Sequence, residues 1–535
     1  MESDILLYCN RLRLFKTLLT LLSNTFYGRK NLIRGFATPE GTELYAQEHS
    51  SFHYGELDQS GLLVSQAGFG CYRVDATVVE HREALRMALL AGANLIDTSS
   101  NYADGGSEAL VGAVLEDLAS SGDISRESVV VVSKVGYLQG QNYELSQERK
   151  RQGSSFRELV LYADGLEHCI HPEFLEDQLT RSLERLRLSC LDFYLLHNPE
   201  YYLSWASKTG LILEEARREY YSRIKRAFEH LEHEVERGRI SFYGISSNTF
   251  PSPATDPEFT SLERVWEIAE SLSSKHHFRL IQLPMNLFET GGVTETNQSN
   301  GQSVVQFARD KKLGVLINRP LNAIIDNRLI RLAEVQATRA ASTEEISQRM
   351  DGLIHSEELL KRKILPELSL TPSLQAQVLE QIAIGGVLKQ QWSNFGSYER
   401  WQELQSFYFA PQIRGVVQFL EQQESLTESV FPWIRSHQEI LEAAFQAISS
   451  VYQEEAAENA ARTKARVSSA DADWAEAATL SQMALRALRS TLGITTVLVG
   501  MRQESYVADV IEELGRPVSR QDRTESWREL QEMHL

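Results

Sequence analysis

The sequence has little cysteine and no long apolar run, and each absence excludes a class of protein. Only four of the 535 residues are cysteines (Cys9, Cys71, Cys169 and Cys190), and no two of them form a C-x-x-C pair. This spacing argues against a disulfide framework or a zinc knuckle, favours a reducing compartment and predicts small buried packing residues. The sequence has no stretch of about 18 or more uncharged apolar residues, so it predicts no integral membrane segment.

Basic residues are also fewer than acidic ones. The 54 Lys and Arg residues face 73 Asp and Glu residues, which gives a formal net charge of -19 and a pI near 5.3. Such a chain repels polyanions at long range, so nucleic acid is not expected as a partner. With 42% hydrophobic residues the composition is that of a globular protein, and its length predicts one large domain with an elaboration.

Residues 1–36 differ in composition from the rest of the chain. Basic residues such as Arg11, Arg13 and Lys16 surround the run L-F-K-T-L-L-T-L-L, and only Glu2 and Asp4 oppose them. A cationic, amphipathic segment followed by R-G-F-A is typical of a mitochondrial presequence and its processing site. The composition predicts import into the mitochondrial matrix; the alternative is a leader without a targeting role on a cytoplasmic protein.

From about residue 60 onward, short apolar runs alternate with longer amphipathic segments, which is typical of repeated strand and helix units. In residues 172–188, for example, Phe174, Leu175, Leu179 and Leu183 share one helical face. Strands are predicted at residues 62–70, 94–99, 129–134, 191–197, 242–246, 278–283, 314–319 and 495–500. Eight parallel strands predict an α/β fold whose sheet closes as a (β/α)8 TIM barrel.

The interval between the last two predicted strands, residues 323–480, contains no convincing strand run. Its apolar residues recur at helical spacing, and it holds many aromatic residues such as Trp392, Trp401 and Trp433. We therefore expect an all-α insertion with its own core, before barrel residues 481–514 and a C-terminal tail at 515–535. This insertion is a packing cap on the barrel, a substrate lid or an oligomerisation element. The last two interpretations arise because the insertion leaves the carboxyl end of the seventh strand, where barrel active sites lie.

Four polar residues lie at or just after consecutive strand ends. Asp97 ends the second strand, Tyr102 follows it in a loop, Lys134 ends the third strand and His197 ends the fourth. An ammonium beside a phenol stabilises the phenolate and lowers the pKa of tyrosine from about 10, and a carboxylate such as Asp97 would hold that ammonium in place. This group can protonate an alkoxide but offers no nucleophile, so the electrons must arrive as hydride from a nicotinamide.

The motifs around these residues resemble those of the aldo-keto reductases. They are G-F-G-C-Y-R, N-L-I-D-T-S-S-N-Y-x-x-G-x-S-E, V-V-V-S-K-V-G, S-L-E-R-L-x-x-x-x-L-D-F-Y-L-L-H-N-P and G-R-I-S-F-Y-G-I-S-S-N. By this likeness Asp97, Tyr102, Lys134 and His197 correspond to the family's catalytic tetrad, with Tyr102 as the general acid. The resemblance implies a barrel formed by residues 52–322 and 481–514, which binds an extended NAD(P)H without a G-x-G-x-x-G fingerprint.

The same resemblance implies contacts to the nicotinamide end of the cofactor. Ser247, Asn248 and Gln282 match the residues that bind the carboxamide, and the run S-S-N leaves open whether Ser246 or Ser247 is the contact. Gly70 and Cys71 match the turn that lies beside the cofactor after the first strand.

The last two strands carry the remaining predicted contacts. Where the family usually has an aromatic residue followed by S-P-L, this chain has Asn318, Arg319, Pro320 and Leu321. The stacking ring is missing, and Arg319 could reach a phosphate. Gly500 and Arg502 match the adenosine-phosphate segment. Arg502 is the candidate for a 2′-phosphate, which favours NADP and leaves NAD possible.

His168, Cys169 and His171 form a cluster without a fourth ligand at suitable spacing, so we expect a helix-leading turn and no metal site. The sequence therefore predicts NAD(P)H-dependent reduction of an aldehyde or ketone, or the reverse oxidation of an aldose. The expected partner is a small-molecule carbonyl or sugar substrate. The alternative is a nicotinamide-binding regulatory subunit on the same barrel with little turnover.

Overall fold

The computed structural model describes residues 32–534, apart from residues 326, 327, 369 and 423–429. Its centre is a closed barrel of eight parallel strands, which confirms the predicted fold class and all eight predicted strand regions. Around the barrel the strands are β3 (Ala67–Gly70), β4 (Leu95–Asp97), β5 (Val130–Val135), β9 (Leu191–His197), β10 (Ile240–Ser246), β11 (Phe278–Pro284), β12 (Gly314–Asn318) and β15 (Thr496–Val499).

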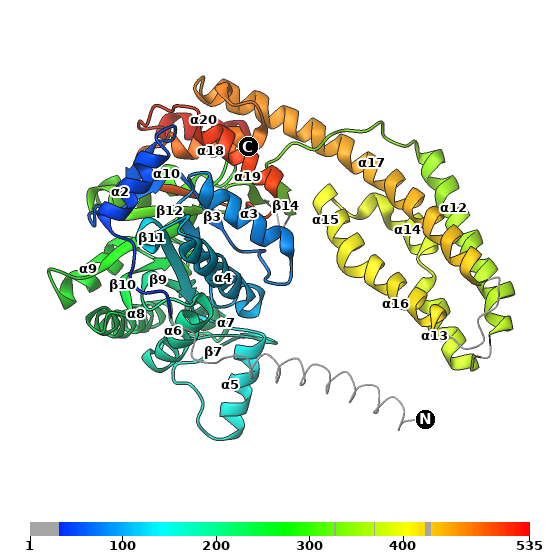
Figure 1. Cartoon of the computed structure of the whole chain (residues 1–535), viewed down its shortest axis with the longest axis horizontal. Helices are drawn as coiled ribbons and strands as arrows, with labels where there is room; N and C mark the ends of the chain where they lie inside the picture. Colours follow the sequence, from blue (N-terminus) through cyan, green and yellow to red (C-terminus); the bar gives the residue numbers. More distant parts are fainter. Residues whose placement is uncertain (1–31, 326–327, 369, 423–429, 535) are drawn as a thin grey trace.

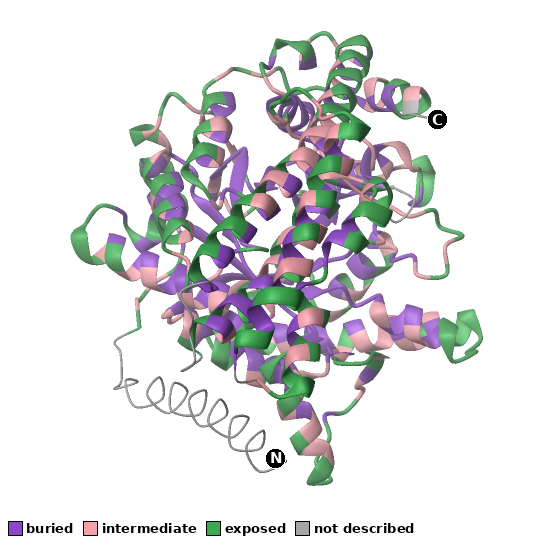
Figure 2. Cartoon of the chain, turned by 90° about the vertical axis from the view of Figure 1, so that its right-hand side faces the viewer, coloured by how far each residue is buried: buried purple, intermediate pink, exposed green. Residues whose placement is uncertain are grey.

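Helices surround the barrel and bury their apolar faces against it (Figures 1 and 2). In α6, for example, His171 is the N-cap, Pro172 occupies the first turn, and Phe174, Leu175 and Leu179 are buried. The helices between successive barrel strands are α3 (Val79–Leu90), α4 (Gly106–Ser121), α6 (Pro172–Leu186), α8 (Leu213–Glu236), α9 (Leu262–Leu272), α11 (Val304–Asp310) and α18 (Leu480–Arg489), and α19 (Glu504–Leu514) follows the last strand.

The first predicted strand, residues 62–70, is divided in two in the structure. Its first part, β2 (Leu63–Ser65), pairs antiparallel with β1 (Tyr54–Glu56), and only β3 enters the barrel. Leu57, Leu62 and Val64 from this hairpin join the apolar cluster inside the barrel. The hairpin therefore closes the amino end of the barrel and leaves the carboxyl end for the polar residues.

Several shorter elements complete this body. A three-stranded sheet of β6 (Tyr137–Leu138), β7 (Val160–Ala163) and β8 (Leu166–His168) follows β5, and the C-terminal tail forms α20, in which Trp527 and Leu530 are fully buried. The other helices are α2 (Pro39–Glu48), α5 (Gln141–Arg151), α7 (Tyr201–Lys208), α10 (Gly291–Thr294) and α20 (Thr524–His534). Residues 1–31 of the predicted leader lie outside the described residues, so mitochondrial targeting stays a prediction.

The segment between β12 and α18 forms a helical arm that extends away from the barrel (Figure 1). It is helical as predicted, except that it opens with an unexpected antiparallel hairpin of β13 (Asn322–Ile325) and β14 (Arg328–Arg331). The arm helices are α12 (Thr343–Leu359), α13 (Pro372–Ile382), α14 (Gly385–Gln391), α15 (Tyr398–Glu403), α16 (Ala410–Glu421) and α17 (Val430–Ala470).

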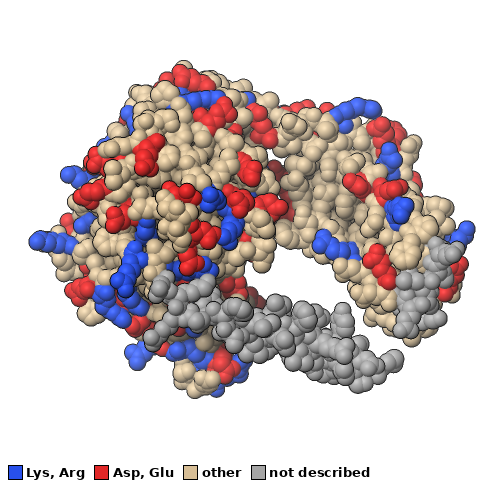
Figure 3. Space-filling model, viewed as in Figure 1, with Lys and Arg blue, Asp and Glu red and all other residues tan. Residues whose placement is uncertain are grey.

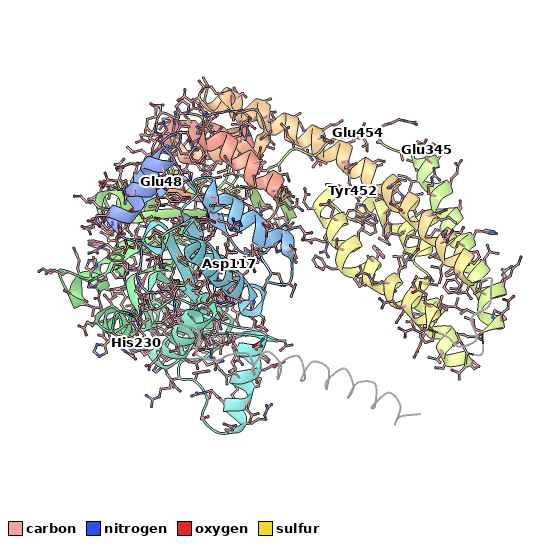
Figure 4. All side chains as sticks on the ribbon, viewed as in Figure 1. Glu48, Asp117, His230, Glu345, Tyr452 and Glu454 are labelled. Atoms are coloured by element: carbon pink, nitrogen blue, oxygen red, sulfur yellow. The ribbon has the colours of Figure 1, made fainter. Side chains whose placement is uncertain are left out.

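The long helix α17 connects two separate apolar cores. Its first part, including Trp433 and Tyr452, packs in the core of the arm, and Figure 4 labels Tyr452 there. Its last part, including Ala460 and Val467, belongs to the core of the barrel body. The predicted insertion boundary at residue 480 therefore lies beyond the point at which the chain rejoins the barrel core. No helix among the described residues is long and apolar enough to cross a membrane.

Candidate active site

The polar residues at the strand ends form one layer across the carboxyl end of the barrel. Side chains two residues apart on a strand point to the same face, so the residue two positions after an inward-facing apolar residue also faces inward. The interior apolar cluster includes Leu95, Val132, Leu195, Leu280 and Leu316. Two positions further along the same strands are Asp97, Lys134, His197, Gln282 and Asn318. Strand alternation thus brings together residues that are far apart in the sequence.

Lys134 is at the centre of this layer. Its side chain is fully buried, and Nζ donates to Asp97 Oδ2 at 2.8 Å, to the Thr98 carbonyl at 2.7 Å and to the Tyr102 hydroxyl at 3.4 Å. The same Nζ lies 4.8 Å from the centre of the Tyr102 ring. All three ammonium protons therefore have acceptors, which fixes the charge beside the phenol. The structure brings Asp97, Tyr102 and Lys134 together as predicted.

The pKa of Tyr102 differs from the sequence prediction. Burial raises the pKa of Tyr102 well above its ordinary value, and the Asp97 carboxylate raises it further. The predicted net lowering of this pKa is therefore not found, because lost hydration and the Asp97 charge raise the pKa by more than a neighbouring ammonium lowers it. Burial also raises the pKa of Asp97 and lowers that of Lys134, and their ion pair opposes both shifts. Tyr102 is thus protonated near neutral pH and can donate a proton.

His197 is held through both its ring and its backbone. Its Nδ1 lies 3.2 Å from Ser99 Oγ, and its carbonyl accepts from His168 Nε2 at 2.7 Å. Burial lowers the pKa of His197 well below its usual value and lowers that of His168 to about 4, so both rings are neutral. A Cβ on Gly136 would lie 2.5 Å from His168 Nε2, so this contact requires glycine. The sequence analysis missed Ser99, although it follows Asp97 by two positions.

Gln282 connects the tetrad to the residues predicted to bind the cofactor. Its Nε2 donates to Asp97 Oδ1 at 2.8 Å, and its Oε1 accepts from Ser246 Oγ at 3.0 Å and from Asn318 Nδ2 at 3.3 Å. Within the described chain, the buried Asn318 Oδ1 has no hydrogen-bond partner. Because a buried acceptor without a donor is costly, this atom fits the N–H group of a ligand such as a carboxamide.

Of the two adjacent serines, the structure places Ser246 beside Gln282. Ser247 Oγ instead lies 3.2 Å from Thr249 Oγ1 and 3.4 Å from Thr260 Oγ1. The Asn248 side chain is exposed, and its backbone N–H donates to Glu200 Oε1 at 2.8 Å.

Glu200 is a buried carboxyl that the sequence analysis missed. Only 2% of the residue is exposed, burial raises its pKa to about 7, and its Oε2 has no partner among the described residues. It occupies the H-N-P-E run just after His197, which is the signal that could have indicated it.

Three arginines lie together beyond the last strand. Burial lowers the pKa of Arg502, and the charges of Arg73 and Arg331 lower it further. Arg331 Nη2 donates to the Tyr506 hydroxyl at 3.2 Å. A Cβ on Gly500 would meet nothing within 4 Å, so the backbone there is open. Like charges held together around open space fit an anionic group such as a phosphate. Arg331 was missed because it belongs to the unexpected hairpin.

The other predicted contacts border the same layer. Arg319 Nη2 is paired with Glu289 Oε1 at 2.8 Å, so its guanidinium already has a counter-ion. Cys71 is fully buried, and burial raises the pKa of its thiol. A Cβ on Gly70 would lie 3.3 Å from the Val499 carbonyl of β15, and Leu321 packs against the barrel core.

The backbone at the rim of the site is strained. Positive φ angles occur at Ala103 (48°) and Asp104 (53°) directly after Tyr102, at Asn198 (50°) after His197 and at Arg319 (53°) after Asn318. Each such residue costs of order 1–3 kcal/mol, and strain of this kind concentrates at functional sites.

The three residues considered for a metal site all have hydrogen-bond partners. His168 donates to the His197 carbonyl, Cys169 Sγ donates to the Arg157 carbonyl at 3.3 Å, and His171 Nδ1 accepts from the Glu173 N–H at the start of α6. Among the described residues no group of three or more His, Cys, Asp or Glu could hold a metal ion.

Comparisons with known proteins show which family this part of the chain resembles. Residues 68–323 match the model of the aldo/keto reductase family. Over 140 residues the chain is 27% identical to an NAD(P)H-dependent D-xylose reductase of Scheffersomyces stipitis, which covers 26% of this chain and 33% of that protein. Over 109 residues it is 33% identical to an NADH-specific methylglyoxal reductase of Escherichia coli, which covers 20% of this chain and 27% of that protein. The chain thus spans about a third or less of the length of these relatives.

Among solved structures, a glycerol dehydrogenase from Gluconobacter oxydans aligns with a TM-score of 0.42 and 14% identity, over 88% of this chain and 93% of that one. This likeness is too low to carry an argument about function.

Proposed function

We propose that the chain, whose residues 68–323 match the aldo/keto reductase family, is an NAD(P)H-dependent oxidoreductase that reduces an aldehyde or a ketone. The observation that carries the proposal is the buried Lys134 ammonium, which contacts both Asp97 and Tyr102 beside a neutral His197. Both curated relatives are named as nicotinamide-dependent reductases, which supports the same class.

The four residues have distinct roles in the proposed reaction. A bound nicotinamide supplies hydride to the carbonyl carbon. Tyr102 gives its proton to the carbonyl oxygen, which becomes a hydroxyl, and the Lys134 ammonium at 3.4 Å stabilises the phenolate that remains. Asp97 keeps Lys134 charged and oriented. His197, neutral because of its burial, orients the carbonyl oxygen without competing for the proton. The same steps in reverse oxidise an alcohol or an aldose.

No observation favours the alternative of a regulatory subunit with little turnover. Such a subunit needs no proton donor beside an ammonium, yet Asp97, Tyr102 and Lys134 keep that arrangement.

Replacement of Tyr102 by Phe tests the catalytic part of the proposal. The variant lacks the acidic proton but keeps the ring, so kcat should fall by about 10²–10⁴-fold while cofactor binding is retained. The measurement is the loss of reduced-nicotinamide absorbance with a panel of aldehydes. Tyr54→Phe is the matched control, because its hydroxyl donates to the Gly92 carbonyl in a part of the barrel remote from the tetrad. Turnover of Tyr102→Phe at the wild-type rate would contradict the mechanism.

For the cofactor, we propose a preference for NADPH over NADH. The support is the pair of Arg331 and Arg502, which fits the additional 2′-phosphate, whereas the nicotinamide end serves both cofactors. Arg331 would extend the phosphate site beyond the segment that the family motif covers.

Replacement of Arg331 by Ala tests this preference. Loss of a charged hydrogen bond should lower kcat/KM for NADPH by roughly 10- to 100-fold and leave that for NADH nearly unchanged. Arg339→Ala is the control, because that exposed side chain pairs with Glu345 in the arm. Equal losses with the two cofactors would show that Arg331 does not bind the 2′-phosphate.

A further inference from the structure

The small sheet of β6, β7 and β8 contacts the carboxyl end of β9, where the tetrad residue His197 lies. Acidic and basic side chains stand side by side on the outer surface of the barrel body (Figure 3). The small sheet instead buries two uncharged polar groups beside His197, the imidazole of His168 and the hydroxyl of Tyr137, which belong to residues only 2% and 8% exposed. Tyr137 and His168 are paired across β6 and β8, so their side chains lie on the same side of the sheet.

His168 holds the backbone of His197. Its Nε2 donates to the His197 carbonyl at 2.7 Å, and burial lowers the pKa of the His168 ring to about 4, so the donor is a neutral imidazole. Gly136 lies between these two residues. A Cβ there would be 2.5 Å from His168 Nε2 and 2.6 Å from the His197 carbonyl oxygen, so any larger residue would force the donor and the acceptor apart.

Tyr137 holds the ring of His197 and the residue that follows it. Its ring packs edge to face with the His197 imidazole at a centroid distance of 4.7 Å, and its hydroxyl accepts from Asn198 Nδ2 at 2.6 Å. Asn198 has a φ of 50°, and its N–H donates to the Ser246 carbonyl at 2.7 Å. A left-handed residue of this kind persists only where its surroundings hold it, and Tyr137 supplies one of those contacts.

The orientation of the His197 ring matters because the ring lies beside the candidate proton donor. Its centre is 6.0 Å from that of the Tyr102 ring, and its Nδ1 is 3.2 Å from Ser99 Oγ. A carbonyl oxygen that meets both Tyr102 and His197 requires the two side chains in one fixed geometry. Small displacements of positioned groups cost large factors in rate.

We propose that the small sheet is a positioning element for His197, in which His168 fixes the end of β9 and Tyr137 fixes the ring and the turn after it. This role rests on the proposed function, because it assigns the two residues to the orientation of the carbonyl through His197. Both are positioning residues and not catalytic ones. The sheet thus links the H-C-I-H segment, which binds no metal, to the chemistry of the tetrad.

Replacement of His168 by Leu in the full-length protein tests the proposal. Leu fills much of the space but cannot donate, so kcat should fall by about 10- to 100-fold while the KM for NADPH stays unchanged. His168→Gln should restore most of the kcat, because its amide can donate to the same carbonyl. His171→Leu is the matched control. His171 caps the start of α6 by accepting from the Glu173 N–H, so its loss should lower stability and leave kcat unchanged.

Tyr137→Phe is the milder variant, which decides the matter if His168→Leu does not fold. It removes the hydroxyl that accepts from Asn198 and keeps the ring beside His197. The loss of one hydrogen bond should lower kcat by about two- to tenfold, again with an unchanged KM for NADPH. A purely structural role of the sheet would instead lower the unfolding temperature of these variants and leave kcat at the wild-type value, which would overturn the proposal.

The nuclear magnetic resonance signal of the His197 ring tests the positioning without turnover. In protein with isotope-labelled histidine, this signal is the one that disappears in His197→Asn. It should shift in His168→Leu and in Tyr137→Phe and stay in place in His171→Leu. A signal that stays in place in the first two variants would overturn the proposal. Absence of turnover for every carbonyl in the wild type, with the signal shifted as expected, would overturn the proposed function alone.

Discussion

The barrel and the arm are stabilised in different ways. Both bury a large apolar core, but the barrel also buries complete ion pairs, among them Lys134–Asp97, Arg126–Asp192 and Arg489–Glu513. In the described part of the arm, every ion pair has both side chains partly or fully exposed. Exposed pairs contribute about 0–1 kcal/mol each. The arm therefore depends on apolar packing, whereas the barrel depends both on apolar packing and on buried charges that must stay paired.

The buried pairs of the barrel lie where distant parts of the chain meet. Arg489 donates to Gln66 Oε1 at 2.9 Å, between β2 and β3, and pairs with Glu513 of α19 at 2.9 Å. This joins the first barrel strand to the last helix of the barrel, on either side of the point where the sheet closes. The difference from the arm suggests that charge is buried here to fix the closure of the barrel.

Breaking one pair in each region should give the largest difference. Glu513→Leu leaves Arg486 and Arg489 buried without this carboxylate, so the free energy of unfolding should fall by about 3–5 kcal/mol. Asp351→Leu removes the exposed partner of Lys389 in the arm and should cost less than about 1 kcal/mol. Urea-induced unfolding followed by circular dichroism measures both.

Equal losses in the two variants would show that the barrel does not depend on its buried charges. Glu513→Gln is the conservative check. It keeps a hydrogen-bond acceptor for Arg489 and should recover part of the loss, because the geometry survives while the charge is removed.

The barrel could be predicted from the sequence because its signal is local. Each strand region is a short apolar run, and alternation places Asp97, Lys134 and His197 on the interior face without knowledge of the neighbouring strands. Pairing partners are not local, so the break at Gln66 and the hairpin of β13 and β14 were not foreseen. The apolar run through residues 62–70 does not reveal that its two halves pair with different strands.

The candidate site shows the same division between local features, which could be predicted, and non-local ones, which could not. The contact of Lys134 with Tyr102 followed from strand ends alone, but the placement of Ser246 Oγ beside Gln282 depends on the register between β10 and β11. Arg331 could not be predicted, because it comes from the insertion, and its contact with Tyr506 depends on how the insertion packs on the barrel. The raised pKa of Tyr102 was not predicted, because the burial of a side chain cannot be read from a motif.

A smaller effect concerns one buried glutamate in each region. Burial raises the pKa of Glu200 in the barrel and of Glu357 in the arm to about 7, and both accept backbone N–H groups, from Asn248 and from Ile384 and Gly385. Because each folded pKa lies above the ordinary value near 4.5, the folded state binds more protons than the unfolded state between these pH values. The stabilisation is thus complete below about pH 4.5 and is lost as the pH rises through about 7.

Glu200→Gln and Glu357→Gln should each remove part of this pH dependence, on the order of 2–3 kcal/mol, because Gln accepts the same N–H groups and does not titrate. The measurement is the urea midpoint of each variant from pH 5 to above pH 7, with the wild type alongside; a slope equal to that of the wild type would contradict the assignment. Only Glu200→Gln should also change the pH profile of the KM for the cofactor, because Glu200 holds the backbone of Asn248 beside the candidate site whereas Glu357 holds the start of α14 in the arm. A matching change in Glu357→Gln would mean that the arm and the barrel are coupled through more than the ion pair between Arg73 of the barrel and Glu403 of the arm.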